Sequence, residues 1–163
     1  MKILSLDPSV NHVGWATLEI EKGESIESGS WDWGCWELDG FNFNMRCQDL
    51  RDRIIEEGVG DFDTLVVEWP AFYDSMKGKV AAKQGHTLNL AGICMYVVGW
   101  FHTDCSQVHL VTAPQWKGNT PKQVTAKRFF DAFGVNHLKE SEHAIDATMM
   151  LLAYGKKQSW YIG

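Results

Sequence analysis

Short apolar runs separated by turn residues fill the beginning of the chain. The run at residues 3–6 ends at Asp7, and two further strand-like runs follow at about 13–21 and 24–37, with a hairpin connection at 21–24. We therefore predict three strands that pair antiparallel. Asp7 closes the first of them, and the carboxyl end of a buried strand is where open α/β sheets tend to bind ligands.

The third of these runs is rich in tryptophan. Trp31, Trp33 and Trp36 have even or nearly even spacing, which predicts large rings on one face of the strand. Such rings can fill a core or stack on nucleic-acid bases. We favour core packing between helix and sheet for all three.

The middle of the chain changes to helical spacing. Four apolar residues recur on one face of a helix predicted at about 42–57: Phe43, Cys47, Leu50 and Ile54. The run at 64–68 is apolar on both faces, which predicts a central strand parallel to its neighbour. That strand also ends in a carboxylate, Glu68.

A second helix is predicted from about residue 80 to residue 101. Its segment 88–98 is apolar nearly all round, so a sheet on one side does not suffice to cover it. We expect a second buried face there, formed by a partner subunit.

The chain then returns to a short strand pattern at 108–111, followed by a predicted loop at 115–119. Thr120 is expected to be the N-cap of the next helix, with Pro121 at its first position and Gln123 completing a capping box. Gly134 is expected to end that helix.

The final helix is predicted at about 141–154. His143 and Asp146 lie three residues apart on one of its stripes, so their side chains can point to the same place.

Composition sets the limits of these expectations. With 163 residues, 45% of them apolar and 22% charged, the chain fits one globular domain spanning 1–163. It has neither a signal-peptide pattern nor an apolar stretch long enough to span a membrane, which predicts a soluble, cytoplasmic protein of a bacterial or phage-infected cell, or of an organelle matrix. The four cysteines are far apart, so neither a zinc site nor a disulfide framework is indicated.

Three acids stand out by their positions. Asp7 and Glu68 each close a strand, and Asp146 lies on the late helix. Carboxylate oxygens are the ligands that Mg²⁺ prefers, and a pair of such ions can assist the displacement at a phosphodiester. The acids therefore suggest metal-assisted hydrolysis without a nucleophilic side chain.

The element order and three motifs give the chain a resemblance to a known family. The motifs are I-L-S-L-D-P-S-V-N-H-V-G-W-A at 3–16, L-V-V-E at 65–68 and H-A-I-D-A at 143–147. Together they resemble the RuvC family of Holliday junction resolvases, in a phage-type or divergent form. The resemblance implies an RNase H-like α/β fold: a five-stranded mixed sheet, three antiparallel strands and then two parallel ones, with helices on both faces.

The same resemblance implies a Mg²⁺-dependent endodeoxyribonuclease that nicks four-way or branched DNA symmetrically in two strands. Asp7, Glu68 and Asp146 take the family's metal-binding positions, for two Mg²⁺ ions or for Mn²⁺. The fourth catalytic and metal-binding position falls on His143, with Glu142 as a rival. The spacing between His143 and Asp146 favours the histidine.

The family also implies a homodimer on branched DNA, and segment 88–98 is the candidate interface. No membrane and no nucleotide cofactor are expected. One of three aromatic residues is expected to enter the junction centre: Trp69, Phe72 or Tyr73. The other expected DNA-binding residues are Lys77, Lys79, Lys83, Trp116, Lys117 and Lys122, and clustered lysines of this kind let a chain of net charge -6 bind phosphate. Ser9 stands where the family often has glycine.

Three other functions compete with this hypothesis. The same acids would serve an RNase H-like nuclease acting on RNA/DNA hybrids or flaps, and a scaffold of this kind could also be a non-catalytic DNA-binding module. An actin-like or sugar-kinase-like nucleotide binder usually needs two such domains and glycine-rich phosphate loops, for which 163 residues leave no room.

Overall fold

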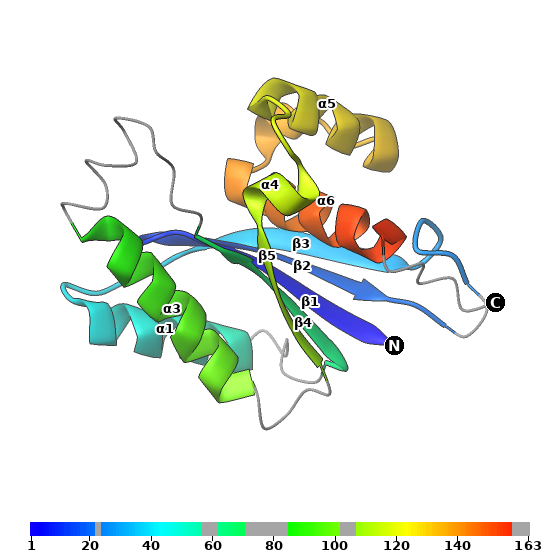
Figure 1. Ribbon diagram of the computed structural model, residues 1–163. Helices are drawn as coiled ribbons and strands as arrows, with labels where there is room; N and C mark the ends of the chain where they lie inside the picture. The colour runs from blue at the N-terminus through cyan, green and yellow to red at the C-terminus, as the bar shows by residue number, and fades with distance from the viewer. Residues whose placement is uncertain (22–23, 57–61, 71–84, 102–106, 158–163) are drawn as a thin grey trace.

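The computed structural model describes residues 1–21, 24–56, 62–70, 85–101 and 107–157. These ranges form one five-stranded sheet with helices on both faces (Figure 1). The elements in chain order are β1 (Lys2–Pro8), β2 (His12–Glu19), β3 (Ser30–Glu37), α1 (Phe43–Glu56), β4 (Thr64–Trp69), α3 (His86–Phe101), β5 (Gln107–Thr112), α4 (Ala113–Trp116), α5 (Lys122–Phe133), η1 (His137–Lys139) and α6 (Glu142–Lys157).

The sheet has the strand order β3-β2-β1-β4-β5. β2 pairs antiparallel with both β1 and β3, whereas β4 pairs parallel with both β1 and β5. The predicted mixed sheet is therefore confirmed. Because Leu6 of β1 is the register partner of Val67 in β4, Asp7 and Glu68 follow at the same edge of the sheet.

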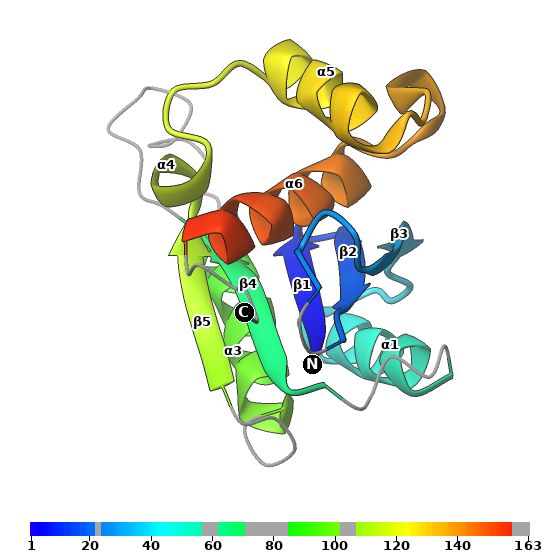
Figure 2. The same cartoon turned by 90° about the vertical axis from the view of Figure 1, so that its right-hand side faces the viewer.

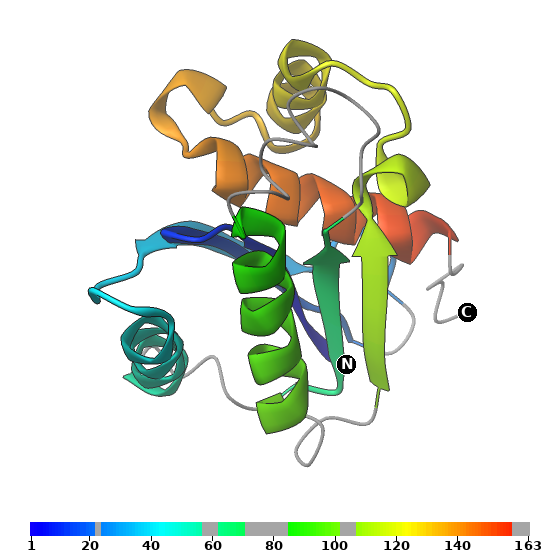
Figure 3. The ribbon, with the colours of Figure 1, turned by 60° about the vertical axis from the view of Figure 1, so that its left-hand side comes forward.

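The helices form two layers. α1 and α3 cover one face of the sheet, and α6 covers the other, with α5 beyond α6 and α4 beside it at the end of β5 (Figures 2 and 3). Because successive strand residues point to opposite faces, Leu4 and Leu6 lie in the core beneath α1 and α3, whereas Ile3 lies in the core beneath α6. Because Asp7 is separated from Ile3 by an even number of positions, its side chain points to the same face of the sheet and faces α6.

The tryptophans of β3 pack in the core, as predicted, but on two faces. Trp31 and Trp33 lie on the α6 side, where each ring contacts Phe133. Trp36 is buried on the opposite side and stacks on Trp15 with a centroid distance of 5.4 Å. The expectation of a single face was wrong, because the odd spacing between Trp33 and Trp36 reverses the side in a pleated strand.

Two local predictions near α5 were wrong. Its N-cap is Pro121, which has extended backbone and whose carbonyl accepts bonds from Val124 and Thr125. Thr120 lies one residue before this cap, where its N–H donates to the carbonyl of Lys117 in the preceding turn. The segment predicted as a loop at 115–119 begins inside α4, a single helical turn.

Other boundaries moved by a few residues. β3 begins at Ser30, because a turn occupies 26–28, where the predicted strand 24–37 would have started. α3 begins at His86, and residues 80–84 of the predicted helix lie outside the described ranges. In the part of the chain that the structure describes, no helix combines the length and apolarity needed to cross a membrane.

Candidate active site

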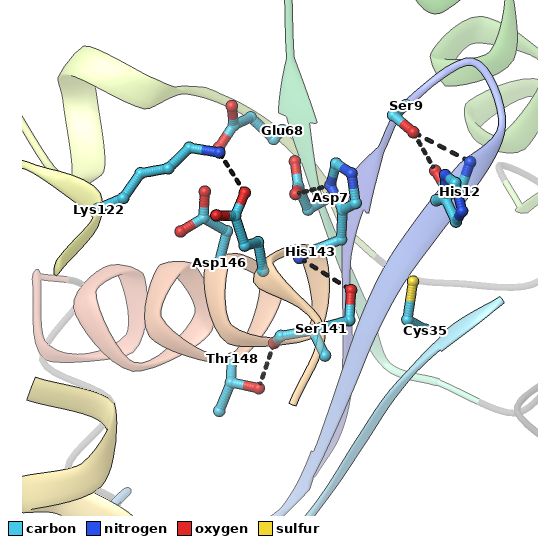
Figure 4. A network of polar contacts seen from close by, with 12 residues as sticks. Asp7, Ser9, His12, Cys35, Glu68, Lys122, Ser141, His143, Asp146 and Thr148 are labelled. Atoms are coloured by element: carbon cyan, nitrogen blue, oxygen red, sulfur yellow. Dashed lines mark hydrogen bonds and ion pairs between the residues drawn. The ribbon is translucent and has the colours of Figure 1, made fainter. Parts of the chain in front are cut away.

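Asp7 and Glu68 form the base of the candidate site, at the ends of adjacent parallel strands (Figure 4). Asp7 is only 7% exposed, and burial raises its pKa although a hydrogen bond with His143 opposes the shift. Burial and the nearby charge of Asp7 raise the pKa of Glu68 from 4.5 to about 7. Neighbouring carboxylates whose negative charges repel each other are typical of a site that binds a cation or retains a proton.

Helix α6 brings the next two groups to this edge. The His143 Nδ1 and Asp7 Oδ2 atoms lie 2.8 Å apart, and this bond raises the pKa of His143. Asp146, one turn further along the helix, contributes a third carboxylate, whose charge adds to the upward shift of the Glu68 pKa after burial and Asp7. The structure thus brings Asp7, Glu68, Asp146 and His143 together at one edge of the sheet.

Two residues of the sheet allow α6 to lie this close. The Ser5 hydroxyl is fully buried and donates to the carbonyl of Ala147 at 2.9 Å. At Gly14, a Cβ would lie 2.0 Å from the carbonyl oxygen of His143. The helix backbone therefore rests directly on β2, opposite Asp7, and only glycine fits there. Sequence reasoning missed both roles, although a serine and a glycine inside apolar strands are visible signals.

The turn between β1 and β2 supports the same histidine. The Ser9 hydroxyl donates to the His12 carbonyl at 2.9 Å and accepts from the His12 N–H at 3.0 Å. The His12 ring stacks on His143, with centroids 6.0 Å apart (Figure 4). Serine at position 9 therefore adds side-chain bonds that glycine could not make.

The short helix α4 reaches the site from β5. The Trp116 indole Nε1–H donates to Glu68 Oε2 at 2.7 Å, and the Lys117 ammonium donates to Asp146 Oδ2 at 2.7 Å. The Gln115 side chain accepts from the Thr112 N–H and so caps the turn that carries both residues. Trp116 and Lys117, expected as DNA-binding residues, thus contact two of the three acids.

Lys122, which Figure 4 shows at the rim of the site, forms an exposed ion pair with Glu142, and their side chains are 69% and 71% exposed. Beside them a cavity of about 390 Å³ opens between α5 and α6, with Asp146 in its wall. Of the two rivals for the fourth position, His143 is bonded to Asp7, whereas Glu142 is paired with Lys122.

Of the remaining predicted residues, the structure describes Trp69 alone. Trp69 ends β4 and packs, half-buried, against the core on the α3 side of the sheet. The other aromatic candidates and the first three lysines lie outside the described residues: Phe72, Tyr73, Lys77, Lys79 and Lys83.

The comparisons with known proteins identify the fold. No protein-family model and no curated protein matches the sequence. The structure of Thermus thermophilus RuvC in complex with a Holliday junction substrate matches with a TM-score of 0.64 and 17% identity, over 97% of this chain and 96% of that one. The chain adopts the fold of RuvC.

Two further solved structures also support a RuvC-like fold for this chain. A second Thermus thermophilus RuvC structure has a TM-score of 0.61 and 17% identity, with 98% and 97% of the two chains covered. The fowlpox virus resolvase in complex with Holliday junction DNA has a TM-score of 0.63 and 12% identity, with 95% and 99% covered. In each case nearly the full length of both chains is aligned.

The donor chemistry of the site fits a hard divalent cation. Three carboxylates from β1, β4 and α6 meet in a RuvC-like fold, and the Lys117 ammonium already balances part of their charge. Within the described ranges, no group of three or more His, Cys, Asp or Glu side chains is arranged to hold a metal as it stands. Each acid instead has an oxygen bonded to a different donor: His143, Trp116 or Lys117.

Proposed function

We propose that this chain is a metal-dependent endonuclease that resolves four-way or branched DNA junctions as a homodimer. The observation that carries the proposal is the meeting of Asp7, Glu68 and Asp146 at one sheet edge of a RuvC-like fold. Two of the similar structures were determined with Holliday junction DNA, which supports a branched substrate for this chain.

The proposed cofactor is Mg²⁺, as two ions, with Mn²⁺ as an alternative. Held by Asp7, Glu68, Asp146 and His143, the metal would activate a water molecule and stabilise the leaving oxygen of the phosphodiester. Glu68 must lose its proton before it can serve as a ligand, and its pKa of about 7 makes that step sensitive to pH.

The neighbouring residues orient these ligands. Trp116 fixes one oxygen of Glu68, and His143 fixes one oxygen of Asp7. Because the His12 ring stacks on His143, that imidazole is itself held in place. Glu68 and Asp7 are thereby oriented before substrate arrives, which lowers the cost of assembling the site.

Substrate phosphates are proposed to bind along the rim. Lys122 is exposed there, and Trp116 of α4 and the following Lys117 reach the same site. The segment after β4 would add its own contacts: Trp69, Phe72, Tyr73, Lys77, Lys79 and Lys83. Phosphate contacts position the duplex arms, whereas a ring wedged between bases would favour a branch point over a continuous helix.

The homodimer is proposed to form through α3. Its inward face buries Ile93, Cys94 and Val97, whereas Leu88 and Met95 are 73% and 54% exposed. These two exposed residues are seven positions apart and so share one side of the helix. A two-fold partner on that side would place a second site on a second junction arm, as paired nicks require.

A reducing compartment such as the cytoplasm is proposed for this activity. Cys35, Cys47 and Cys94 are free thiols, and two of them are buried. Unpaired cysteines of this kind are usual where thiols are kept reduced.

The decisive experiment compares a mobile four-way DNA junction, a linear duplex and an RNA/DNA hybrid, each with Mg²⁺ and with EDTA. We expect paired symmetric nicks in the junction only when Mg²⁺ is present. Asp7→Asn should abolish cutting but retain junction binding, whereas Asp39→Asn, at a side chain 87% exposed, should cut normally. Preferential cutting of the hybrid would instead favour the RNase H-like alternative, and binding without any cutting would favour the non-catalytic one.

A further inference from the structure

Lys117 places a positive charge inside the acidic site. Its ammonium donates to Asp146 at 2.7 Å, and the two side chains are 18% and 14% exposed. Opposite charges this close and this well shielded attract strongly and are little screened by salt. In the absence of metal, the Lys117 ammonium therefore already balances the negative charge of Asp146.

The same charge acts on the other two acids. Burial raises the pKa of Asp7 and of Glu68, and in both cases the charge of Lys117 opposes that rise. One ammonium thus compensates three carboxylates contributed by three elements. A divalent cation that binds these carboxylates would need the same place.

The backbone of Lys117 is anchored, and its ammonium is carried on a flexible four-carbon stem. The Lys117 N–H donates to the Ala113 carbonyl at 2.9 Å, and the Lys117 carbonyl accepts from Thr120 at 3.0 Å. The ammonium lies 4.6 Å from the centre of the Trp116 ring. Rotation of the four-carbon stem would therefore remove the charge from Asp146 without moving α4.

We propose that Lys117 is a resident counter-cation of the metal-free site, and that a divalent metal ion binds by displacing its ammonium from Asp146. This inference rests on the proposed function, because it assumes that Asp7, Glu68 and Asp146 bind a metal. Lys117 then lowers the metal affinity of the site and reduces the repulsion among the three carboxylates in the metal-free protein.

The first test measures the binding of Mg²⁺ alone by calorimetry, without DNA. Lys117→Met should bind Mg²⁺ about tenfold more tightly than the unchanged chain, the equivalent of one charge-assisted hydrogen bond that no longer has to be broken. Lys156→Met is the matched control, because Lys156 forms a 2.8 Å ion pair with Glu27 in which both side chains are half-exposed. That variant should bind Mg²⁺ as the unchanged chain does.

The second test needs no variant and therefore does not depend on how Lys117→Met folds. The unchanged protein is acetylated with an amine-reactive ester, with and without Mg²⁺, and each lysine is quantified by mass spectrometry. Displacement exposes the Lys117 ammonium and releases it from Asp146, so its labelling rate should rise severalfold with Mg²⁺. The labelling rate of Lys156 should not change.

The outcomes separate this inference from the proposed function. Equal Mg²⁺ affinity in Lys117→Met and the unchanged chain, or a Lys117 labelling rate that Mg²⁺ leaves unchanged or lowers, would overturn the counter-cation role and leave a metal-dependent nuclease intact. If neither protein bound Mg²⁺, the metal-dependent function would fail and the inference with it.

Discussion

At the scale of single residues, the proton on Glu68 links the site to stability. The pKa of Glu68 is about 7 in the folded protein against an ordinary 4.5, because of burial and the charge of Asp7. The folded state therefore binds a proton more tightly than the unfolded chain, and this stabilisation is full below pH 4.5 and lost as the pH rises through 7. The pKa values of Asp7 and His143 are also raised, so they act in the same direction.

We predict that the metal-free protein loses stability between pH 5 and pH 8, with Glu68 contributing about 3 kcal/mol at most. Urea unfolding in EDTA across this range measures the loss. Glu68→Gln should flatten the pH dependence, whereas Glu37→Gln, at an exposed residue, should leave it unchanged. The same slope in Glu68→Gln and the unchanged chain would show that Glu68 ionises normally.

The Trp116 indole offers a second residue-scale prediction. Its hydrogen bond favours the charged form of Glu68 and holds down a pKa that burial raises. Trp116→Phe removes the donor, so Glu68 should ionise at a higher pH and Mg²⁺ binding should require a more alkaline solution. Calorimetric Mg²⁺ titrations at several pH values measure this shift.

A matched variant controls for the loss of an indole donor as such. Trp31→Phe removes a hydrogen bond of similar length, from Trp31 Nε1 to the Ile26 carbonyl at 3.1 Å, far from the acids. It should leave the pH dependence of Mg²⁺ binding in place. An identical shift in both variants would refute a specific role for Trp116.

At the scale of elements, the site depends on how closely α6 lies on β2. We predict that Gly14→Ala forces the helix away from the sheet, because its Cβ would lie 2.0 Å from the His143 carbonyl oxygen. The variant should lose at least about 2 kcal/mol of unfolding free energy and most of its cleavage activity. Gly99→Ala in α3, where a Cβ meets nothing within 4 Å, should be neutral or stabilising. Equal stability of Gly14→Ala and the unchanged chain would contradict this packing.

The sequence predicted elements well where hydrophobic periodicity is strong. Spacing within a single element was enough to predict the strands, the parallel direction of β4, and the position of His143 and Asp146 on one side of α6. The one-turn helix α4 was missed because a segment of this length that contains proline has no helical period to detect. The contact between Lys117 and Asp146 joins residues 29 positions apart, so only the folded chain reveals it.

At the scale of the whole molecule, the candidate active site and the proposed dimer surface lie on opposite faces of the sheet. α3 packs on one face together with α1, whereas α6, which carries His143 and Asp146, covers the other (Figure 3). A second subunit on α3 would leave the α6 side of each sheet open to DNA. A chain of net charge -6 can offer phosphate only local positive groups, and the exposed Lys122 is one such group on the α6 side.

We predict that Met95→Glu converts the dimer to a monomer, because it places a charge at the centre of the exposed side of α3. Sedimentation at micromolar concentration measures the change. Without a partner, junction cutting should become single unpaired nicks. Mg²⁺ binding should stay the same, because Met95 lies on the exposed side of α3, away from the acids. Phe41→Glu, at an apolar residue 98% exposed outside α3, should remain dimeric. If the unchanged chain sediments as a monomer, the α3 interface is excluded. If Met95→Glu is monomeric and still makes paired nicks, paired cutting does not need two sites in one assembly.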